Sequence, residues 1–259
     1  MSRYRILIAA LLFFAGSAYA NLQHCQLKVG WLDWPPYQYE DKHGAPQGFD
    51  IAIIKAIAQQ TQCKIIFRKL TWMRQHVEAV NGKLDIILGV SPVGPLKHFV
   101  NSESFRSDPI GFYWFKGSRK HDPKSLVELL RYKTKLGVVH SYHRSKELEE
   151  LMADTRYKRS FFTLQTLEGA LKNLRKGRLD AAFLHIESAN AILTSEPIQG
   201  LTLNKSLSFS TEVYIALALS SPLGKEFIIN INQSINTLKR NGTYKRLVDE
   251  HLNNQIHFK

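Results

Sequence analysis

The sequence predicts an α/β protein of two lobes, each a mostly parallel sheet flanked by helices. Short apolar segments of strand length alternate with segments of helical periodicity. Several strands end in turns of glycine, proline and polar residues. Open α/β sheets bind ligands at this edge, where the carboxyl ends of the strands lie. An extended aromatic stretch near residue 105 separates two such series. We therefore expect lobe segments at 21–112, 113–208 and 209–259, the last returning to the first lobe.

The first twenty residues are typical of a secretory signal peptide. Arg3 and Arg5 precede an apolar run at 6–14, and an Ala-Tyr-Ala site ends the segment 1–20. The run is too short for a membrane span, which needs about 20 apolar residues. Cys25 lacks the preceding small-residue box of a lipid anchor. We therefore expect a soluble protein that is exported to the periplasm.

The chain is strongly basic, with 35 Lys and Arg against 22 Asp and Glu and a formal net charge of +13. These basic residues are scattered singly between apolar positions, whereas nucleic-acid-binding segments gather them in runs or patches. We therefore expect no nucleic-acid partner. The expected form is a monomer whose basic surface lies near anionic lipid or collects anionic small molecules.

Cys25 and Cys63 are the two cysteines, and each precedes a predicted strand, at 27–31 and at 64–68. If these strands are parallel neighbours joined by the intervening helix, their starts lie at the same sheet edge. The exported context then favours a disulfide, which contributes roughly 4 kcal/mol in the chain-entropy model. CxxC and zinc-binding spacings are absent, and we expect no metal and no cofactor.

The stretch 30–50, which follows the first strand, has the composition of a binding lip. Its two consecutive prolines end the strand because neither can donate a ladder hydrogen bond. Trp34 and Tyr37 flank these prolines, so two rigid aromatic rings are held at the carboxyl end of the strand. We expect these rings to contact the ligand.

The rest of the first series continues the α/β pattern. Asp50 is expected to cap a helix with apolar positions Ile51, Ile54 and Ile57. The unbroken apolar strand at 84–88 is typical of a strand covered on both faces. The other predicted elements are a strand at 64–68, a helix at 72–80 and a polar turn at 89–92.

The aromatic segment from residue 105 is expected to cross to the second lobe. The series that follows is expected to contain helices at 126–130, 146–152 and 167–176, and strands at 136–139, 161–164 and 181–184. A strand at 213–219 then returns. Ser221-Pro222 is expected to open a long helix that ends before Asn241-Gly242, and a last helix at 244–252 closes the chain.

Six motifs, in this order along the chain, resemble those of bacterial periplasmic solute-binding proteins of family 3. They are PPY at 35–37, GxPxGFD at 44–50, Trp72 with NGKLD at 81–85, SDP at 107–109, KGRLDAAF at 176–183 and NGTYKRL at 241–247. The resemblance implies a type II binding-protein fold that closes on a small solute, usually an amino acid. It also implies delivery of that solute to an ABC permease.

The resemblance also implies site residues. Trp34 or Tyr37 would stack on the ligand, Trp72 would add an apolar wall, and the turn from Gly89 to Ser91 would offer hydrogen-bond donors. The arginine that grips the ligand carboxylate in amino-acid binders corresponds to Lys97 here, which keeps the charge but loses the guanidinium fork.

Two further positions depart from the amino-acid-binding pattern. The second-lobe turn that is usually Gly-Thr-Thr reads Ser141-Tyr142-His143, and the aspartate that receives the ammonium group is His185. With Lys97 and His140, these residues make the predicted cleft cationic and favour a small organic anion. Amino acids stay open as ligands because Asp33 or Glu187 could provide an ammonium site.

Three functions are therefore compared. The leading interpretation is a non-catalytic solute receptor for an ABC importer. An enzyme on the same scaffold, similar to cyclohexadienyl dehydratase, would need a carboxylic acid with a raised pKa in the cleft, and Glu187 is the candidate. A sensory receptor that reports the solute to a membrane kinase or cyclase is the third possibility.

Overall fold

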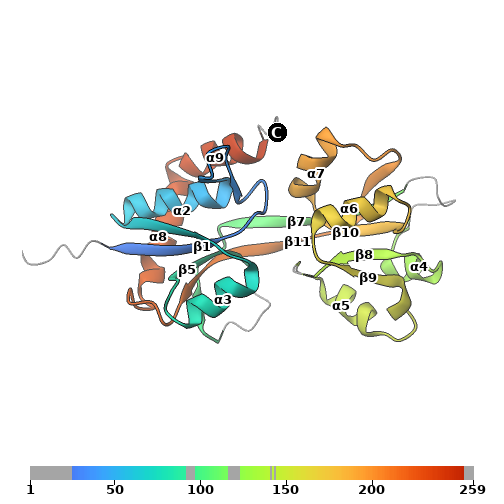
Figure 1. The fold of residues 1–259 in the computed structure, drawn as a ribbon, viewed down its shortest axis with the longest axis horizontal. Helices are drawn as coiled ribbons and strands as arrows, with labels where there is room; N and C mark the ends of the chain where they lie inside the picture. The colour runs from blue at the N-terminus through green and yellow to red at the C-terminus, as the bar shows by residue number, and fades with distance from the viewer. Residues whose placement is uncertain (1–24, 92–96, 116–122, 141, 143, 254–259) are drawn as a thin grey trace, which may run out of the picture.

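The computed structural model describes residues 25–91, 97–115, 123–140, 142 and 144–253. The expected signal peptide at 1–20 lies outside these residues. Two lobes lie side by side, and two long strands run between them (Figure 1). These are β7 (Arg106–Phe115) and β11 (Leu201–Ala218), which pair antiparallel with each other. Because β11 also pairs with the sheet of the first lobe and β7 with the sheet of the second, one sheet passes through the whole molecule.

The sheet of the first lobe is mostly parallel, as expected. Its strands follow the order β4 (Lys64–Lys69), β1 (Gln26–Trp31), β5 (Ile86–Val90) and β11, with β6 (Phe99–Asn101) also on β11. The first three strands are parallel, and β11 and β6 are antiparallel additions. The small hairpin of β2 (Tyr39–Glu40) and β3 (Pro46–Gln47) belongs to the lip.

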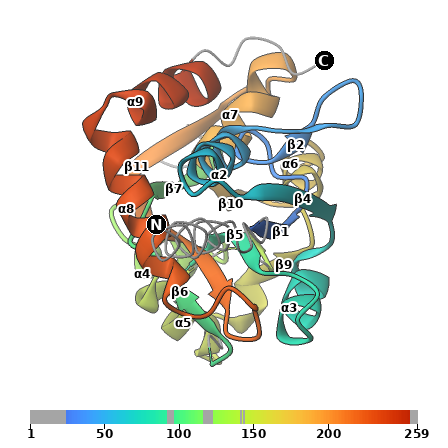
Figure 2. The ribbon, with the colours of Figure 1, turned by 90° about the vertical axis from the view of Figure 1, so that its left-hand side faces the viewer.

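Helices cover both faces of this sheet, as Figure 2 shows from the end of the first lobe. One face carries α2 (Phe49–Gln60), α8 (Phe227–Arg240) and α9 (Thr243–Val248), and a π-helical turn, Asp249–Asn253, follows. Ile231, Ile235 and Leu238 of α8 are buried in the same core as Leu27 and Val29 of β1. The opposite face is covered by α3 (Trp72–Val80). The C-terminal helices therefore pack on the first lobe.

The second lobe repeats this arrangement. Parallel strands β10 (Ala181–His185), β8 (Leu136–Val139) and β9 (Phe161–Leu164) extend from β7. Alternate residues point to opposite faces of a strand, so β10 contributes Phe183 to one core and Leu184 to the other. The first core is covered by α4 (Leu126–Arg131) and α5 (Lys146–Ala153). The second is covered by α6 (Leu167–Arg175) and α7 (Ile186–Ser195).

The predicted disulfide is confirmed, with Cys25 and Cys63 joined at the aligned starts of β1 and β4. Two helix starts were predicted wrongly. The Ser221-Pro222 segment forms a turn, and α8 begins only at Phe227. Asp50 does not cap α2; it lies inside the helix, because the cap position is Gly48. A Cβ atom on Gly48, whose φ is +109°, would lie 2.4 Å from the Tyr37 carbonyl oxygen, so only glycine fits there.

Candidate functional site

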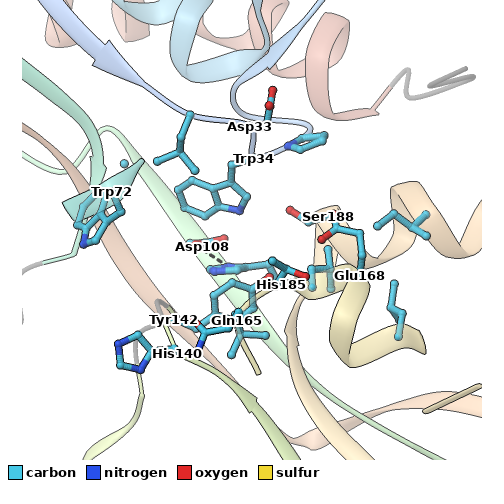
Figure 3. Close-up of a pocket in the computed structure, with 18 of the residues that line it drawn as sticks. Asp33, Trp34, Trp72, Asp108, His140, Tyr142, Gln165, Glu168, His185 and Ser188 are labelled. Carbon is cyan, nitrogen blue, oxygen red and sulfur yellow. Dashed lines mark ion pairs between the residues drawn. The ribbon is translucent and has the colours of Figure 1, made fainter. Parts of the chain in front are cut away.

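A cleft of about 1620 Å³ lies where the lip, the crossing strands and the second lobe meet. Its walls come from both lobes. The first lobe contributes the lip, the start of α3 and the end of β5, and the second contributes the end of β10 and the facing sides of α6 and α7. Figure 3 shows the aromatic residues Trp34, Trp72 and Tyr142 around this cleft, with His185 between them. The crossing strands form its floor, with Asp108 of β7 and Thr211 of β11.

The lip is held in a tight turn by its own backbone. The amide of Trp34 donates to the carbonyl of Gln38 at 2.6 Å, and the amide of Gln38 donates back at 3.0 Å. Behind this turn, Gly89 approaches the indole so closely that a Cβ atom would lie 2.7 Å from the Trp34 ring. The ring is therefore fixed against β5, as a wall of the cleft requires.

A buried ion pair supports the lip from below. Nε of Arg106 lies 2.8 Å from Oδ1 of Asp50, and its Nη2 donates to Oδ2 at 3.3 Å. Gln38 donates to the same carboxylate at 3.0 Å. The guanidinium also lies over the rings of Tyr37 and Trp34, 3.6 and 4.9 Å from their centroids. Burial opposes the charge of Arg106, but the neighbouring carboxylates hold its pKa above the ordinary value.

Tyr37 takes part in this support and is not among the described residues that line the cleft, in contrast to the expectation that its ring faces the ligand. Its ring is 1% exposed. The hydroxyl lies 3.2 Å from Oδ1 of Asp108 and 3.1 Å from Oε2 of Glu187. Burial raises the pKa of Tyr37, which keeps the hydroxyl protonated. Of the two predicted lip rings, only Trp34 faces the cleft.

His185 lies at the floor of the cleft beside a carboxylate. Its Nδ1 is 2.7 Å from Oδ2 of Asp108, at ion-pair distance but without the directionality of a hydrogen bond. The imidazole meets the edges of Trp34 and Tyr142, with ring centroids 5.0 and 3.8 Å apart. Burial opposes the ionisation of Asp108, yet His185 and Arg106 hold the pKa of Asp108 below its ordinary value.

Several buried polar atoms around the cleft have no hydrogen-bond partner among the described residues. They are Nε1 of Trp34, Oγ of Ser188 and Nε of Arg144. Leaving such a group unpaired costs about 1–3 kcal/mol, so a native protein seldom buries one without a use for it. The indole nitrogen can only donate, and the hydroxyl can donate or accept. These groups match a ligand that carries acceptor oxygens.

The other predicted site residues divide into three groups. Trp72, Gly89, Ser91 and Tyr142 line the cleft, together with His140. Lys97 is exposed and is not among the described residues that line it. Ser141 and His143 lie outside the described residues.

The charge of the cleft therefore differs from the expectation. His185 is paired with Asp108, and Lys97 is not among the described residues that line the cleft. Two of the residues that were expected to make the cleft cationic therefore do not present an unpaired positive charge to it. Asp33, one of the two proposed ammonium sites, lines the cleft but lies 2.6 Å from Nζ of Lys69. Glu187, the other, contacts Tyr37 and is not among the described lining residues.

Sequence reasoning missed three contributors, namely Arg106, Asp108 and Ser188. A signal for the first two was present, because they occupy alternate positions of an otherwise apolar and aromatic strand and so face the same side of it. Charged residues on such a strand are buried only when they are paired. The described residues contain no group of three or more side chains that could hold a metal ion. None of their helices has the length and apolar character needed to cross a membrane.

Comparisons with known proteins agree with this architecture. Residues 27–96 match the model of bacterial extracellular solute-binding proteins, family 3. The probable amino-acid-binding protein YxeM of Bacillus subtilis (strain 168) is 26% identical over 276 residues, covering 99% of this chain and 97% of the relative.

Solved structures share the fold at low sequence identity. A substrate-binding protein of an ABC uptake transporter from Streptococcus pneumoniae, with bound histidine, superposes with a TM-score of 0.71 at 17% identity, over 90% of this chain and 95% of the other. A histidine kinase sensor domain similar to periplasmic binding proteins also superposes with a TM-score of 0.71, at 19% identity, over 88% of this chain and 96% of the other. The fold is thus that of a two-lobed type II binding protein. The family match over residues 27–96 and the relative aligned along nearly the whole chain both support the resemblance to solute-binding protein family 3.

Proposed function

We propose that the protein is an exported receptor that binds a small polar solute, an amino acid or a small organic acid, in the cleft between its lobes. The observation that carries this proposal is the set of unpaired buried polar atoms around the cleft, at Trp34, Arg144 and Ser188. Each can pair with an acceptor oxygen of a carboxylate, a group common to both ligand classes. The amino-acid class also draws on the similarity to a probable amino-acid-binding protein.

The partner at the membrane is proposed to be an ABC permease, with a membrane sensor as the alternative, because the family resemblance implies transport. A receptor is favoured over an enzyme by the position of Glu187. This carboxyl group contacts the Tyr37 hydroxyl at 3.1 Å and is not among the described residues that line the cleft. An acid catalyst must reach the proton acceptor of its substrate.

The test is a thermal-shift screen of the mature protein against the proteinogenic amino acids and a set of small organic acids. A true ligand raises the melting temperature, since binding at 100 times Kd adds about 2.7 kcal/mol of stability. Calorimetry with the best compound then compares wild type with Trp34→Ala and Trp34→Phe.

Trp34→Ala should lower the affinity about ten- to hundredfold, because it removes an apolar wall worth about 1–3 kcal/mol. Trp34→Phe, the matched control, keeps an aromatic ring and loses the indole donor, so the affinity should fall by a smaller factor. If no compound of either class shifts the melting temperature, the proposed ligand classes are wrong. Equal affinities of all three proteins would place the ligand elsewhere.

A further inference from the structure

The hydroxyl group of Tyr37 lies between two carboxyl groups from different parts of the molecule. Tyr37 belongs to the lip of the first lobe, Asp108 to the crossing strand β7, and Glu187 to the first turn of α7 in the second lobe. The Tyr37 oxygen is 3.2 Å from Oδ1 of Asp108 and 3.1 Å from Oε2 of Glu187. A hydroxyl has one hydrogen and can donate to only one of them. The second contact is a hydrogen bond only if that carboxyl group carries a proton of its own.

The surroundings decide which carboxyl group is protonated. Asp108 lies beside two basic groups, with Nδ1 of His185 at 2.7 Å and Nη1 of Arg106 at 3.6 Å. Among the ion pairs between described residues, Glu187 takes part in none. Burial raises the pKa of Glu187, whereas that of Asp108 is held low. Asp108 is therefore the favoured ionised acceptor, and Glu187 is the carboxyl group that keeps its proton to the higher pH.

We propose that Glu187 is a protonated carboxylic acid that donates a hydrogen bond to the Tyr37 hydroxyl, which in turn donates to Asp108, so that Glu187 positions the lip against the second lobe. Glu187 is thus a positioning residue, since it acts on the cleft through Tyr37. The ring of Tyr37 meets the edge of Trp34 at a centroid distance of 5.1 Å, and Trp34 is the wall of the cleft. The role in solute binding rests on the proposed function, whereas the hydrogen-bonded chain does not.

Loss of the proton would weaken this link. With Glu187 ionised, two carboxylates compete for one hydroxyl hydrogen, and one of the two contacts becomes repulsive. The charged and titratable groups that face Glu187 are Tyr37 from the lip, Arg106 and Asp108 from β7, and Tyr113, also from β7. His185 precedes α7 and pairs with Asp108. Arg106 is the nearby cation in this set, and it is already bound to Asp50.

The first test measures the melting temperature of the ligand-free protein against pH for wild type and Glu187→Gln. A carboxyl group whose pKa is higher in the folded than in the unfolded protein binds more protons when folded. Its stabilising contribution is therefore full below the ordinary glutamate value of about 4.3 and is lost as pH rises above it. The melting temperature of wild type should accordingly fall relative to that of Glu187→Gln as pH rises. Glu147→Gln, which removes an exposed carboxylate of α5, should keep the pH profile of wild type.

The second test follows the fluorescence of Trp34, taken as the difference between each protein and the same protein carrying Trp34→Phe. In wild type this signal should titrate with the same midpoint as the stability. This titration step should be absent in Glu187→Gln, whose amide still donates to Tyr37, and also in Tyr37→Phe, which breaks the chain. A residue that only fills space would not give a titration that the isosteric amide abolishes.

A direct measurement on wild type covers the case in which a variant fails to fold. Infrared difference spectra with 13C-labelled glutamate should show a carboxylic-acid carbonyl band that persists above the pH at which ordinary glutamates, with a pKa of about 4.3, have lost theirs. The proposal is overturned if this band is absent, or if wild type and Glu187→Gln share one pH profile. All three readouts are made without ligand, so a negative solute screen would leave them unaffected and would count only against the proposed function.

Discussion

Two buried acid–base pairs lie close together beneath the cleft, and they differ in how fully they are hydrogen-bonded. Asp50 accepts from Arg106 through both of its oxygens and from Gln38 through one of them. Asp108 meets His185 at 2.7 Å without hydrogen-bond directionality. The Asp50 pair is enclosed by the first lobe, whereas Asp108 and His185 both line the cleft.

This difference suggests different roles for the two pairs, with the first supporting the lip and the second facing the solute. The Asp50 carboxylate accepts three hydrogen bonds from inside the protein, so it has nothing left to offer a ligand, and it fixes the parts that it joins. Nη1 of Arg106 has no hydrogen-bond partner among the described residues, but it is buried and lies 3.6 Å from Oδ1 of Asp108. A pair that faces a cleft and has hydrogen-bonding capacity left can be completed by a solute. We therefore expect changes in the first pair to alter mainly folding stability, and changes in the second to alter mainly solute affinity.

The largest effect should follow from Arg106→Met. This substitution leaves Asp50 buried without its cation, and removing one partner of a buried ion pair costs about 3–5 kcal/mol. Urea unfolding monitored by circular dichroism measures the loss. The matched control is Arg246→Met, which breaks an exposed pair with Glu250 and should change the free energy of unfolding little. If the two variants lose similar stability, the Asp50–Arg106 pair does not support the lip.

An intermediate effect, on binding, is expected for His185→Gln. The amide keeps the approximate size of the ring but breaks the contact of the imidazole with Asp108, and a hydrogen bond to a charged group typically contributes about 1.5–3 kcal/mol. The affinity for an acidic solute should fall about tenfold or more by calorimetry. Stability should fall less than in Arg106→Met, because Asp108 keeps the contacts with Arg106 and the Tyr37 hydroxyl.

Glutamine is a better choice here than aspartate, the residue that amino-acid binders have at this position. His185→Asp would place a second carboxylate beside Asp108, and the repulsion would obscure any gain in ammonium binding. The comparison between the two pairs fails if His185→Gln destabilises the fold as much as Arg106→Met and leaves the solute affinity unchanged.

The smallest effect is expected for Lys97→Met. The family pattern gives this position to the group that grips the ligand carboxylate, but Lys97 is exposed and outside the described lining of the cleft. We expect the affinity to change by less than about twofold, which is a few tenths of a kcal/mol. A loss of about tenfold would instead show that the Lys97 side chain contacts the solute.

The sequence by itself determined the alternation of strands and helices, the crossing segment and the disulfide. These features depend on signals between near neighbours, such as the period of apolar residues or the proline and glycine that end a strand. The strands Leu136–Val139 and Phe161–Leu164 and the helix Trp72–Val80 were accordingly predicted to the residue. The place of Trp34 at the turn was also predicted, because a ring beside two prolines must lie there, whereas its contact with a solute stays a prediction.

Only the tertiary structure decided which charged groups meet. Arg106 is 56 positions from Asp50, and the hydroxyl of Tyr37 meets a carboxyl group 150 positions away. No local sequence pattern predicts contacts between residues so far apart in the chain. The free energy of a buried charge depends on which partner the packing of β7 and α7 brings close to it. For the same reason the direction of Tyr37 could not be foreseen. A tyrosine beside Trp34 can face solvent or the interior, and Arg106 and Glu187 beneath the turn hold it in the interior.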